Sequence, residues 1–487
     1  MLKKINLIYM HKTKIKKYSK KMELENLQTI SLIILILYII IYTQRYSNSP
    51  VLLRGIVEGF YGTPWSNEIR IDLIKFCSEY NLNSYIYAPK DDPYHREKWR
   101  LPYPSEKMTE LKNLVDISKQ YNIYFIFAVS PGLDLVYQEE KDLLSMIYKL
   151  DMMYDIGIRN FAIFFDDLDP DQDGKAQAEF LNKLQNALNK KYNDIFPLIT
   201  IPTKYTRKYM YDLDGNINAY TKEFSTILNK KIIVLYTGDK VVSDGISEQS
   251  FKETKNIYKR NLGIWWNYPV NDYFKSNNIV LNSKLALGPI EKLPKAKPNS
   301  IFFNPMQQPL LSKIAIATGA EYALSPSKYE PIKSWNKVID KQFGDLAKYM
   351  KIFASHSQHM EKGRAKVGPP DGEEFYNKSH KAILDIKNGL KVDFNEIITL
   401  IDEMENAAKN LLEKLPKNIL NECQLMLEQF KRIAKAGKVA VNSLINGKID
   451  IDLKKMRQDI KNNEEKAILS ELSAVLFIDE VIELFDT

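Results

Sequence analysis

The chain has 487 residues, of which 45% are hydrophobic and 27% are charged, a balance typical of a globular protein with a sizeable core. Its formal net charge of +8 is concentrated near the start, because residues 1–26 contain eight Lys and two Glu, which leaves about +2 for the remaining 461 residues. A nearly neutral body lacks the clustered basic face that nucleic-acid binding needs, and two distant cysteines, Cys77 and Cys423, provide neither a disulfide framework nor a cysteine-based zinc site.

The first predicted element is a membrane anchor at residues 27–43. This stretch, LQTISLIILILYIIIYT, contains no charge, and about seventeen residues are near the lower limit for crossing a bilayer core. The lysine-rich segment before it predicts a cytosolic N-terminus, with everything after residue 44 on the extracytoplasmic side. A cleaved signal peptide, which would give a secreted protein, is the alternative, but the letters YTQRY at 42–46 contain no small-residue cleavage site. Met22 offers an alternative start for the same anchor.

Eight short runs rich in β-branched and aromatic residues follow, at intervals of roughly thirty to forty residues. They are LLRGIVEGF (52–60), SYIYAP (84–89), IYFIFAV (123–129), FAIFF (161–165), PLITIP (197–202), KIIVLYTG (231–238), GIWWN (263–267) and SIFFN (300–304). Continuous apolar runs of this length are typical of strands buried on both faces. Amphipathic stretches such as 68–80 and 176–190 lie between several of them. This alternation predicts an α/β fold, a TIM-type (β/α)8 barrel over residues 52–330 with a helix after each strand.

A helical bundle is predicted for residues 335–487. Its clearest element is an apolar stripe with a spacing of three or four residues, formed by Phe394, Ile397, Ile401, Met404, Ala408, Leu411 and Leu415. We expect this stripe to lie in the core of an antiparallel bundle that packs on the barrel. His356 and His359 are interpreted as part of a solvated helix surface, because no third metal ligand is near them in the sequence.

Polar and aromatic residues gather at the ends of the predicted strands, where the loops of a TIM-type barrel form the active site. These residues are Gly59, Tyr61, Lys90, Asp166, Asp167, Tyr205, Thr237, Trp265, Asn267, Asp272 and Asn304. The sequence contains no esterase, dinucleotide-binding or P-loop motif. A calcium loop that begins at Asp169 would require Glu where Phe180 stands. The remaining carboxylates, amides and aromatic rings are the groups that recognise sugars.

The adjacent pair Asp166–Asp167 indicates a particular mechanism. A retaining glycosidase ordinarily places two carboxylates about 5 Å apart on opposite sides of the scissile bond. Two neighbouring residues at one strand end cannot easily straddle a bond in this way. They suit a reaction in which the substrate's own 2-acetamido oxygen is the nucleophile, while one carboxylate orients the acetamido N–H and the other protonates the leaving oxygen.

Seven sequence blocks occur in order between residues 52 and 330. They are RGIVEGFYGTPW (54–65), YAPKDDPYHREKWR (87–100), SPGLD (130–134), FFDDLD (164–169), YTGDKVV (236–242), IWWNYPVND (264–272) and NPMQQP (304–309). Together they resemble the family-84 glycoside hydrolases, the O-GlcNAcase and bacterial β-N-acetylglucosaminidase group, some of which are called hyaluronidases. Two positions depart from the family pattern, because Lys204 stands where Glu is usual and no acidic residue follows Met306.

The resemblance implies a role for each site residue. Asp166 would orient the acetamido group, and Asp167 would act as general acid and then as general base. The implied substrate-binding residues would contact the sugar hydroxyls, the acetamido group or its methyl, or form the pocket wall. They are Gly59, Tyr61, Lys90, Tyr205, Thr237, Val241, Trp265, Asn267, Asp272 and Asn304.

The predicted function is that of a retaining, exo-acting β-N-acetylglucosaminidase that uses no metal ion or organic cofactor. Its predicted partners are a glycan or glycoprotein with terminal β-linked N-acetylglucosamine and, through residues 27–43, a membrane. Two alternatives stay open. One is a hyaluronan-degrading enzyme of the same fold, and the other is a membrane-tethered lectin that binds the sugar without hydrolysing it. Retention of both aspartates favours the enzyme, since binding alone needs no general acid.

Overall fold

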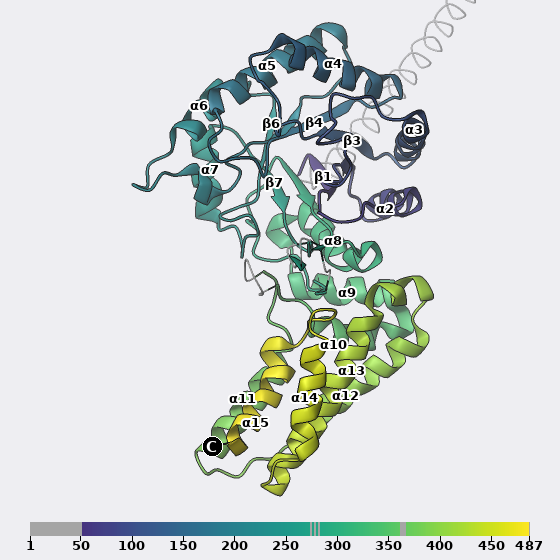
Figure 1. Cartoon of the computed structure of the whole chain (residues 1–487), viewed down its shortest axis with the longest axis vertical. Helices are drawn as coiled ribbons and strands as arrows, with labels where there is room; N and C mark the ends of the chain where they lie inside the picture. Colours follow the sequence, from purple (N-terminus) through teal and green to yellow (C-terminus); the bar gives the residue numbers. More distant parts are fainter. Residues whose placement is uncertain (1–50, 273–274, 277–278, 281–282, 361–366, 487) are drawn as a thin grey trace, which may run out of the picture. The chain divides into compact units, whose positions relative to one another are not determined.

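The computed structural model describes residues 51–486, except for 273–274, 277–278, 281–282 and 361–366 (Figure 1). The predicted anchor at 27–43 and the basic segment before it lie outside the described residues. Within the part of the chain that is described, no helix has both the length and the apolar character needed to cross a membrane.

Eight parallel strands close into a barrel, which confirms the predicted TIM-type fold. Each predicted apolar run overlaps one strand, and the order around the barrel is β1-β10-β7-β6-β5-β4-β3-β2. The strands are β1 (Leu53–Glu58), β2 (Ser84–Tyr87), β3 (Tyr124–Val129), β4 (Asn160–Phe164), β5 (Ile199–Ile201), β6 (Ile233–Tyr236), β7 (Gly263–Trp266) and β10 (Ser300–Phe303).

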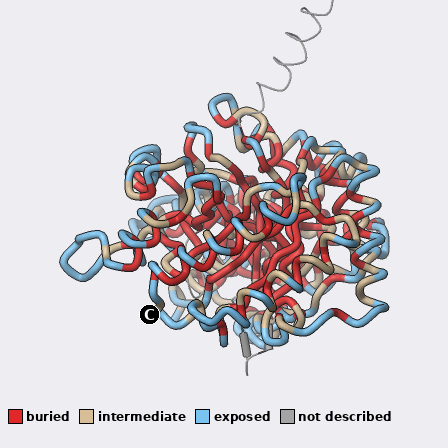
Figure 2. The backbone as a smooth tube through the Cα atoms, turned by 90° about the horizontal axis from the view of Figure 1, so that it is seen from above, coloured by how far each residue is buried: buried red, intermediate tan, exposed pale blue. Residues whose placement is uncertain are grey.

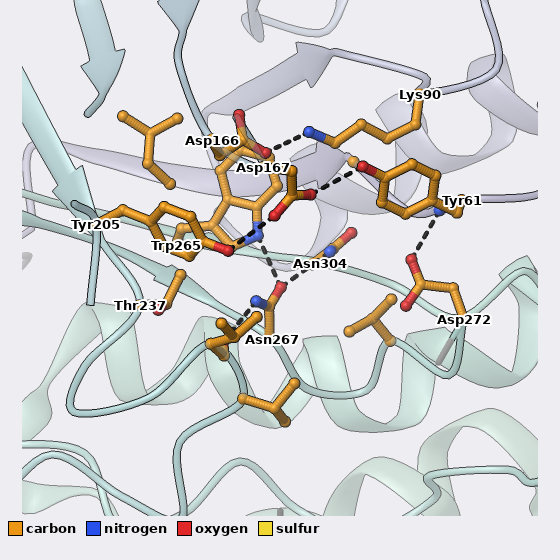
Figure 3. A pocket seen from close by; sticks show the side chains of 15 residues that line it. Tyr61, Lys90, Asp166, Asp167, Tyr205, Thr237, Trp265, Asn267, Asp272 and Asn304 are labelled. Atoms are coloured by element: carbon orange, nitrogen blue, oxygen red, sulfur yellow. Dashed lines mark hydrogen bonds and ion pairs between the residues drawn. The ribbon is translucent and has the colours of Figure 1, made fainter. Parts of the chain in front are cut away.

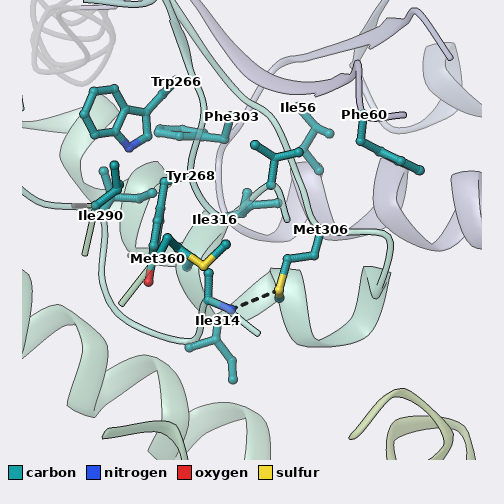
Figure 4. Packing of buried hydrophobic residues seen from close by; sticks show 14 of the residues in the cluster. Ile56, Phe60, Trp266, Tyr268, Ile290, Phe303, Met306, Ile314, Ile316 and Met360 are labelled. Carbon is teal, nitrogen blue, oxygen red and sulfur yellow. Dashed lines mark hydrogen bonds between the residues drawn. The ribbon is translucent and has the colours of Figure 1, made fainter. Parts of the chain in front are cut away.

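The strands read as continuous apolar runs because both of their faces are buried (Figure 2). Along β1, Val57 belongs to a cluster inside the barrel, whereas its neighbour Ile56 belongs to the cluster between the strands and the helices. The same alternation separates the two tryptophans of β7. Trp265 lies with the interior cluster, and Trp266 packs outside near Ile290 and Phe303 (Figure 4).

Helices cover the outside of the barrel. They are α2 (Asn67–Glu79), α3 (Ser105–Gln120), α4 (Glu140–Asp155), α5 (Gly174–Lys191), α6 (Ala219–Ile227), α7 (Glu248–Tyr258) and α8 (Pro309–Leu324). Side chains cap several of them, since Asp173 accepts a hydrogen bond from the backbone N–H of Ala176 at the start of α5. The predicted stretches 68–80 and 176–190 correspond to α2 and α5.

One crossover departs from the predicted regular repeat. Between β7 and β10, the described residues form no helix but a short hairpin, β8 (Lys275–Ser276) and β9 (Ile279–Val280), followed by loops. Prolines at 269, 289, 294 and 298 explain the difference, because each lacks a backbone N–H and restricts the residue before it.

The C-terminal region is helical, as predicted. Its elements are α9 (Pro331–Phe343), α10 (Ala347–Ser355), α11 (Glu373–Lys387), α12 (Asn395–Lys414), α13 (Lys417–Asn446), α14 (Ile451–Asn462), a π-helical turn (Glu471–Val475) and α15 (Leu476–Asp486). A two-residue link joins α12 to α13, which makes them an antiparallel pair. The predicted stripe on α12 is buried, apart from the half-buried Phe394.

The prediction for the two histidines is wrong. His356 ends α10 and is buried, and its Nδ1 lies 2.9 Å from the hydroxyl of Ser470. His359 is also buried, in the loop that follows. Neither belongs to a solvated helix surface. The segment around Ser470, more than a hundred residues later, covers His356, and the loop up to Asp371 packs on His359.

The helical region contacts the start of α8 through a residue of α13. The carboxylate of Glu422, on α13, accepts hydrogen bonds from the backbone N–H groups of Leu310 and Leu311 at the start of α8, at 3.0 and 2.9 Å. A carboxylate at this position satisfies donors that have no partner within the helix. The bundle therefore provides the cap that α8 lacks in its own sequence, since Gln308 makes no capping hydrogen bond.

Candidate active site

A cavity of about 90 Å³ lies at the carboxyl ends of the barrel strands, and all twelve predicted site residues line it (Figure 3). The structure adds three apolar residues that sequence reasoning missed, Ile201, Val242 and Val270. Val242 and Val270 fall inside two of the sequence blocks, but an apolar side chain gives no chemical signal of its own. The cavity is therefore the site that the strand-end pattern predicted.

A buried ion pair joins two strand ends on one side of the cavity. Lys90, after β2, contacts Asp166, after β4, through its Nζ and the carboxylate Oδ2. Burial disfavours the charged form of the lysine, but the adjacent carboxylate outweighs this effect and raises the pKa of Lys90. Oδ1 of Asp166 is also buried and accepts no hydrogen bond from the described residues. Asp166 thus has one oxygen available to accept a donor from a ligand.

The backbone explains how two adjacent aspartates can line one cavity. Successive residues of an extended strand point to opposite sides. Asp167, however, has φ of 57°, a left-handed conformation that Asp tolerates better than most residues. The chain turns sharply there, so that Asp166 is buried while Asp167 is exposed at the mouth, and both reach the same cavity.

Two tyrosines hold the carboxylate of Asp167 (Figure 3). The hydroxyl of Tyr61 donates to Oδ2 at 2.8 Å, and that of Tyr205 donates to Oδ1 at 2.9 Å. Arg96 donates in turn to the Tyr61 hydroxyl at 2.9 Å, a contact that the sequence analysis did not predict. These donors fix the orientation of the carboxylate.

The electrostatics favour the ionised form of Asp167. Partial desolvation at the cavity mouth raises its pKa, but the positive charge of Lys90 and the hydrogen bonds from Tyr61 and Tyr205 outweigh that effect. The pKa of Asp167 is therefore lowered from its usual value. Burial and the nearby carboxylates raise the pKa of Tyr205, so its hydroxyl stays a donor.

Two asparagines form the opposite side of the cavity. Oδ1 of Asn267 accepts from Nε1 of Trp265 at 2.8 Å and from Nδ2 of Asn304 at 3.0 Å. Nδ2 of Asn267 donates to the carbonyl of Val241 at 2.7 Å. Oδ1 of Asn304 is buried and has no hydrogen-bond donor among the described residues. This oxygen is a second acceptor available to a ligand.

The other predicted residues shape and connect the loops. A Cβ at Gly59 would lie 2.4 Å from Cζ2 of Trp265, so only glycine leaves room for the indole. Asp272 accepts from the backbone N–H of Tyr61 at 2.7 Å and thereby joins the loops after β7 and β1. The hydroxyl of Thr237 donates to the carbonyl of Lys240 at 2.7 Å. Asp173, which would belong to a calcium loop starting at Asp169, instead caps α5.

Comparisons with sequence families agree with this arrangement. The family profile described as beta-N-acetylglucosaminidase matches residues 54–355, and one described as hyaluronidase post-catalytic domain-like matches residues 383–478. The protein O-GlcNAcases of Mus musculus and Rattus norvegicus are 34% identical to this chain over 282 residues, which are 55% of this chain and 30% of each relative. The chain therefore spans less than a third of the length of these relatives.

The chain is also similar to solved structures. CpGH84B is similar with a TM-score of 0.81 and 34% identity, over 89% of this chain and 77% of that one. A mutant of the Thermobaculum terrenum O-GlcNAc hydrolase is similar with a TM-score of 0.75 and 27% identity, over 89% of this chain and 94% of that one. Both similarities extend over the barrel and most of the helical region.

Proposed function

Because this chain belongs to the β-N-acetylglucosaminidase family, the family-84 glycoside hydrolases, we propose that it hydrolyses terminal β-linked N-acetylglucosamine with retention of configuration. The observation that carries the proposal is the pair Asp166–Asp167, two adjacent carboxylates with different surroundings in one small cavity. One is buried against Lys90, and the other is held by two tyrosines at the mouth.

In the first step, the acetamido oxygen of the substrate attacks the anomeric carbon and the bond to the leaving oxygen breaks. Asp167 gives its proton to that oxygen, while Asp166 accepts a hydrogen bond from the acetamido N–H and strengthens the nucleophile. The free Oδ1 of Asp166 supports this role, since it is an acceptor without a partner among the described residues. The products of the step are the protonated leaving group and a cyclic oxazolinium ion, whose N–H stays hydrogen-bonded to the carboxylate of Asp166.

In the second step, water attacks the anomeric carbon and opens the oxazoline. Asp167, now ionised, takes the proton from this water, and the acetamido group is restored. Two inversions at one carbon give net retention. Tyr61 and Tyr205 support the sequence of roles, because they hold the Asp167 carboxylate in place while it is ionised.

The cavity also supports exo action. Its volume of about 90 Å³ fits a single buried sugar better than a polymer lying in an open cleft. Asn304 and Asn267 would bind the hydroxyls, Trp265 would form the wall, and Thr237 and Val241 would lie beside the acetamido methyl.

The test compares aryl β-N-acetylglucosaminide with the aryl β-glucoside of the same phenol. We expect turnover of the first and little or none of the second, since the glucoside lacks the nucleophile. Comparable rates would exclude substrate assistance, and binding of N-acetylglucosamine without any turnover would identify a lectin. For the hyaluronan alternative, internal cleavage of the polymer would contradict exo action, whereas release of single terminal residues would agree with it.

For location, we propose that residues 27–43 anchor the chain with the barrel on the extracytoplasmic side. The charge difference around this segment supports the proposal. Protease added to intact cells should digest the barrel and spare the N-terminal tail. A barrel that is protected until lysis would contradict it.

A further inference from the structure

One charged side chain contacts the site from behind its cavity. Arg96 lies in the loop between β2 and α3 and is not among the described residues that line the cavity. Its Nη1 nevertheless donates a hydrogen bond to the hydroxyl of Tyr61 at 2.9 Å, and the same hydroxyl donates to Oδ2 of Asp167 at 2.8 Å. Two consecutive hydrogen bonds therefore connect a positive charge to the proposed general acid and base.

The direction of these two hydrogen bonds follows from the chemistry of the groups. A guanidinium has five N–H donors and no acceptor, and it stays charged throughout the pH range of a folded protein. The Tyr61 oxygen must therefore accept from Arg96, so its own single proton is left for another partner. Oδ2 of Asp167 lies in position to accept that proton. Arg96 thus orients the Tyr61 hydroxyl as a donor to Asp167.

The guanidinium also contacts the ring of Tyr61. Its central carbon lies 5.6 Å from the ring centroid, within the range of a cation–π contact. Burial raises the pKa of Tyr61, and the positive charges of Lys90 and Arg96 oppose this effect only in part, so the hydroxyl keeps its proton. A phenol beside a cation is a polarised donor, which strengthens its hydrogen bond to a carboxylate.

The loop that carries Arg96 is fixed to the barrel by the residue before it. His95 is fully buried, and its Nδ1 lies 2.8 Å from the carbonyl oxygen of Ala128 on β3. The carbonyl of His95 accepts from the backbone N–H of Ser130 at 2.9 Å. Burial lowers the pKa of His95 to about 4, so its imidazole is neutral near pH 7 and adds no charge beside Arg96. The backbone at Arg96 is therefore held in place while its side chain reaches Tyr61.

Several loops bring charged or titratable groups to the carboxylate of Asp167. Partial desolvation raises the pKa of Asp167, whereas the charge of Lys90, the two tyrosine hydrogen bonds and the charge of Arg96 lower it. Arg96 can therefore act on Asp167 through space as well as through Tyr61. The groups around the carboxylate are Tyr61, Lys90, Arg96, Asp166 and Tyr205, and those on its open side are Lys208, Tyr209 and Lys240.

We propose that Arg96 is a positioning residue of the reaction, which directs the hydroxyl proton of Tyr61 onto Asp167. This inference rests on the proposed function, in which Asp167 is the general acid and then the general base. As Asp167 gives its proton to the leaving oxygen, negative charge develops on the carboxylate, and the hydrogen bond from Tyr61 stabilises this charge. Arg96 strengthens that hydrogen bond without touching the sugar, so no covalent step is added to the reaction.

The test measures the pH dependence of kcat/KM for the full chain, with an aryl β-N-acetylglucosaminide whose phenol is a poor leaving group. Arg96→Met keeps an unbranched side chain but removes every donor. The pKa of Asp167 should rise, so the alkaline limb should move to higher pH, as in Tyr61→Phe. On the plateau below this limb, kcat/KM should fall about two- to tenfold, the effect of one hydrogen bond. An acidic phenol, which needs little protonation, should show a smaller fall.

The double variant Arg96→Met with Tyr61→Phe separates action through Tyr61 from action through space. If Arg96 acts through Tyr61, the alkaline limb of the double variant should nearly coincide with that of Tyr61→Phe alone. Arg96→Lys keeps a cationic donor and should move the limb back toward that of the unaltered chain. Shifts that add in the double variant, or an alkaline limb that does not move in Arg96→Met, would overturn the proposal. A loss of folded protein would lower the rates with both phenols equally and leave the limb in place.

Lys98→Met is the matched control, since Lys98 is an exposed cation of the same loop and its side chain makes no described contact with Tyr61. Its alkaline limb should stay in place, and a shift equal to that of Arg96→Met would contradict a specific role of Arg96. If the unaltered chain hydrolyses aryl β-N-acetylglucosaminide and Arg96→Met keeps the same pH profile, the positioning role is wrong and the proposed function stands. If the unaltered chain hydrolyses no β-N-acetylglucosaminide, the proposed function fails, and this inference fails with it.

Discussion

Two buried lysine–aspartate pairs in different regions of this chain differ in whether both carboxylate oxygens have a partner. At the barrel mouth, Lys90 pairs with Asp166, whose second oxygen accepts no hydrogen bond from the described residues. Where the bundle meets the barrel, Lys284 lies 3.5 Å from Asp371 and 3.0 Å from Glu471. Oδ1 of Asp371 also accepts from the backbone N–H groups of Gln358 and His359, at 2.6 and 2.7 Å.

This difference indicates how a functional ion pair can be told from a structural one. Both pairs are almost completely excluded from solvent, so burial does not separate them. What separates them is an unused acceptor beside a cavity, because a buried polar atom without a partner costs free energy until a ligand satisfies it. Asp166 has such an atom, and the oxygens of Asp371 are both in use.

The largest expected effect concerns the two catalytic aspartates. Asp167→Asn removes the proton donor and should lower kcat/KM by about 10²–10⁴-fold for poor leaving groups, and least for acidic phenols. Asp166→Asn weakens the nucleophile and should affect all leaving groups more evenly. The measurement is kcat/KM over phenyl N-acetylglucosaminides of graded phenol pKa.

Asp169→Asn is the control, since Asp169 is exposed and, among the described residues, its carboxylate accepts only from the backbone N–H of Asp171. It should retain full activity. A steeper dependence on the leaving group in Asp166→Asn than in Asp167→Asn would exchange the two assignments.

The second expected effect concerns the junction pair, Lys284 and Asp371, which lies where the bundle meets the barrel. Lys284→Met leaves Asp371 buried and without its cation, which should lower the free energy of unfolding by about 3–5 kcal/mol. The protein that remains folded should keep its kcat/KM within a few-fold. Urea unfolding and activity are measured on the same sample.

The double variant Lys284→Met with Asp371→Asn serves as the control for this pair. It removes both charges, keeps an acceptor for the backbone N–H groups of Gln358 and His359, and should regain much of the stability. A large loss of kcat/KM in Lys284→Met without a loss of stability would mean that the junction pair acts on the reaction. The distinction between a functional pair at Asp166 and a structural pair at Asp371 would then be wrong.

The third expected effect is a shift in the pH dependence of kcat/KM. The Tyr205 hydrogen bond lowers the pKa of Asp167, so Tyr205→Phe should raise this pKa. Asp167 has to be protonated for the first step. The alkaline limb of kcat/KM, measured with a poor leaving group, should therefore move to higher pH.

Tyr209→Phe is the matched control, because Tyr209 contacts Tyr205 but donates no described hydrogen bond to Asp167. Its alkaline limb should stay in place. A shift to lower pH in Tyr205→Phe would show that Tyr205 does not stabilise the ionised carboxylate.

The smallest effect concerns the cap of α8. Burial raises the pKa of Glu422 to about 7, although the N–H groups of Leu311 and Leu310 oppose the shift. The folded state therefore holds this proton more tightly than the unfolded state, and stability should fall as the pH rises from about 4.5 to 7. Glu422→Gln keeps an acceptor for the helix but cannot ionise, so this part of the pH dependence should disappear.

Melting temperatures between pH 4.5 and 8 measure the difference. Glu413→Gln, an exposed substitution on α12, should leave the slope unchanged. A slope that is the same in Glu422→Gln and in the unaltered chain would show that the cap does not titrate in this range.

Strand positions and strand-end residues could be predicted from the sequence for a local reason. A strand buried on both faces is a continuous apolar run, so a polar residue such as Lys90 or Asp166 directly after it marks the end of the strand. All strand ends of a parallel barrel meet at one edge, so such residues converge without knowledge of distant contacts.

Other features depend on contacts that no local pattern records. The burial of His356 depends on Ser470, and the cap of α8 comes from Glu422. Arg96 contacts the site through the hydroxyl of Tyr61. The packing of Gly59 against Trp265 joins two strands that are far apart in sequence. These contacts could not be assigned before the fold was known, although Gly59 and Trp265 themselves were predicted as site residues.

The crossover without a helix also decides how this protein can be cut or recombined. Its backbone bonds to the later helices, since Leu287 donates to the carbonyl of Ser357 at 2.8 Å and accepts from Trp335 at 2.6 Å. Tyr268, next to the site residue Asn267, donates to the carbonyl of Gln358 at 2.9 Å. A barrel excised near residue 330, or grafted onto the bundle of a relative, would lose these partners together. The two regions are therefore a single module for protein engineering and are best exchanged as one piece.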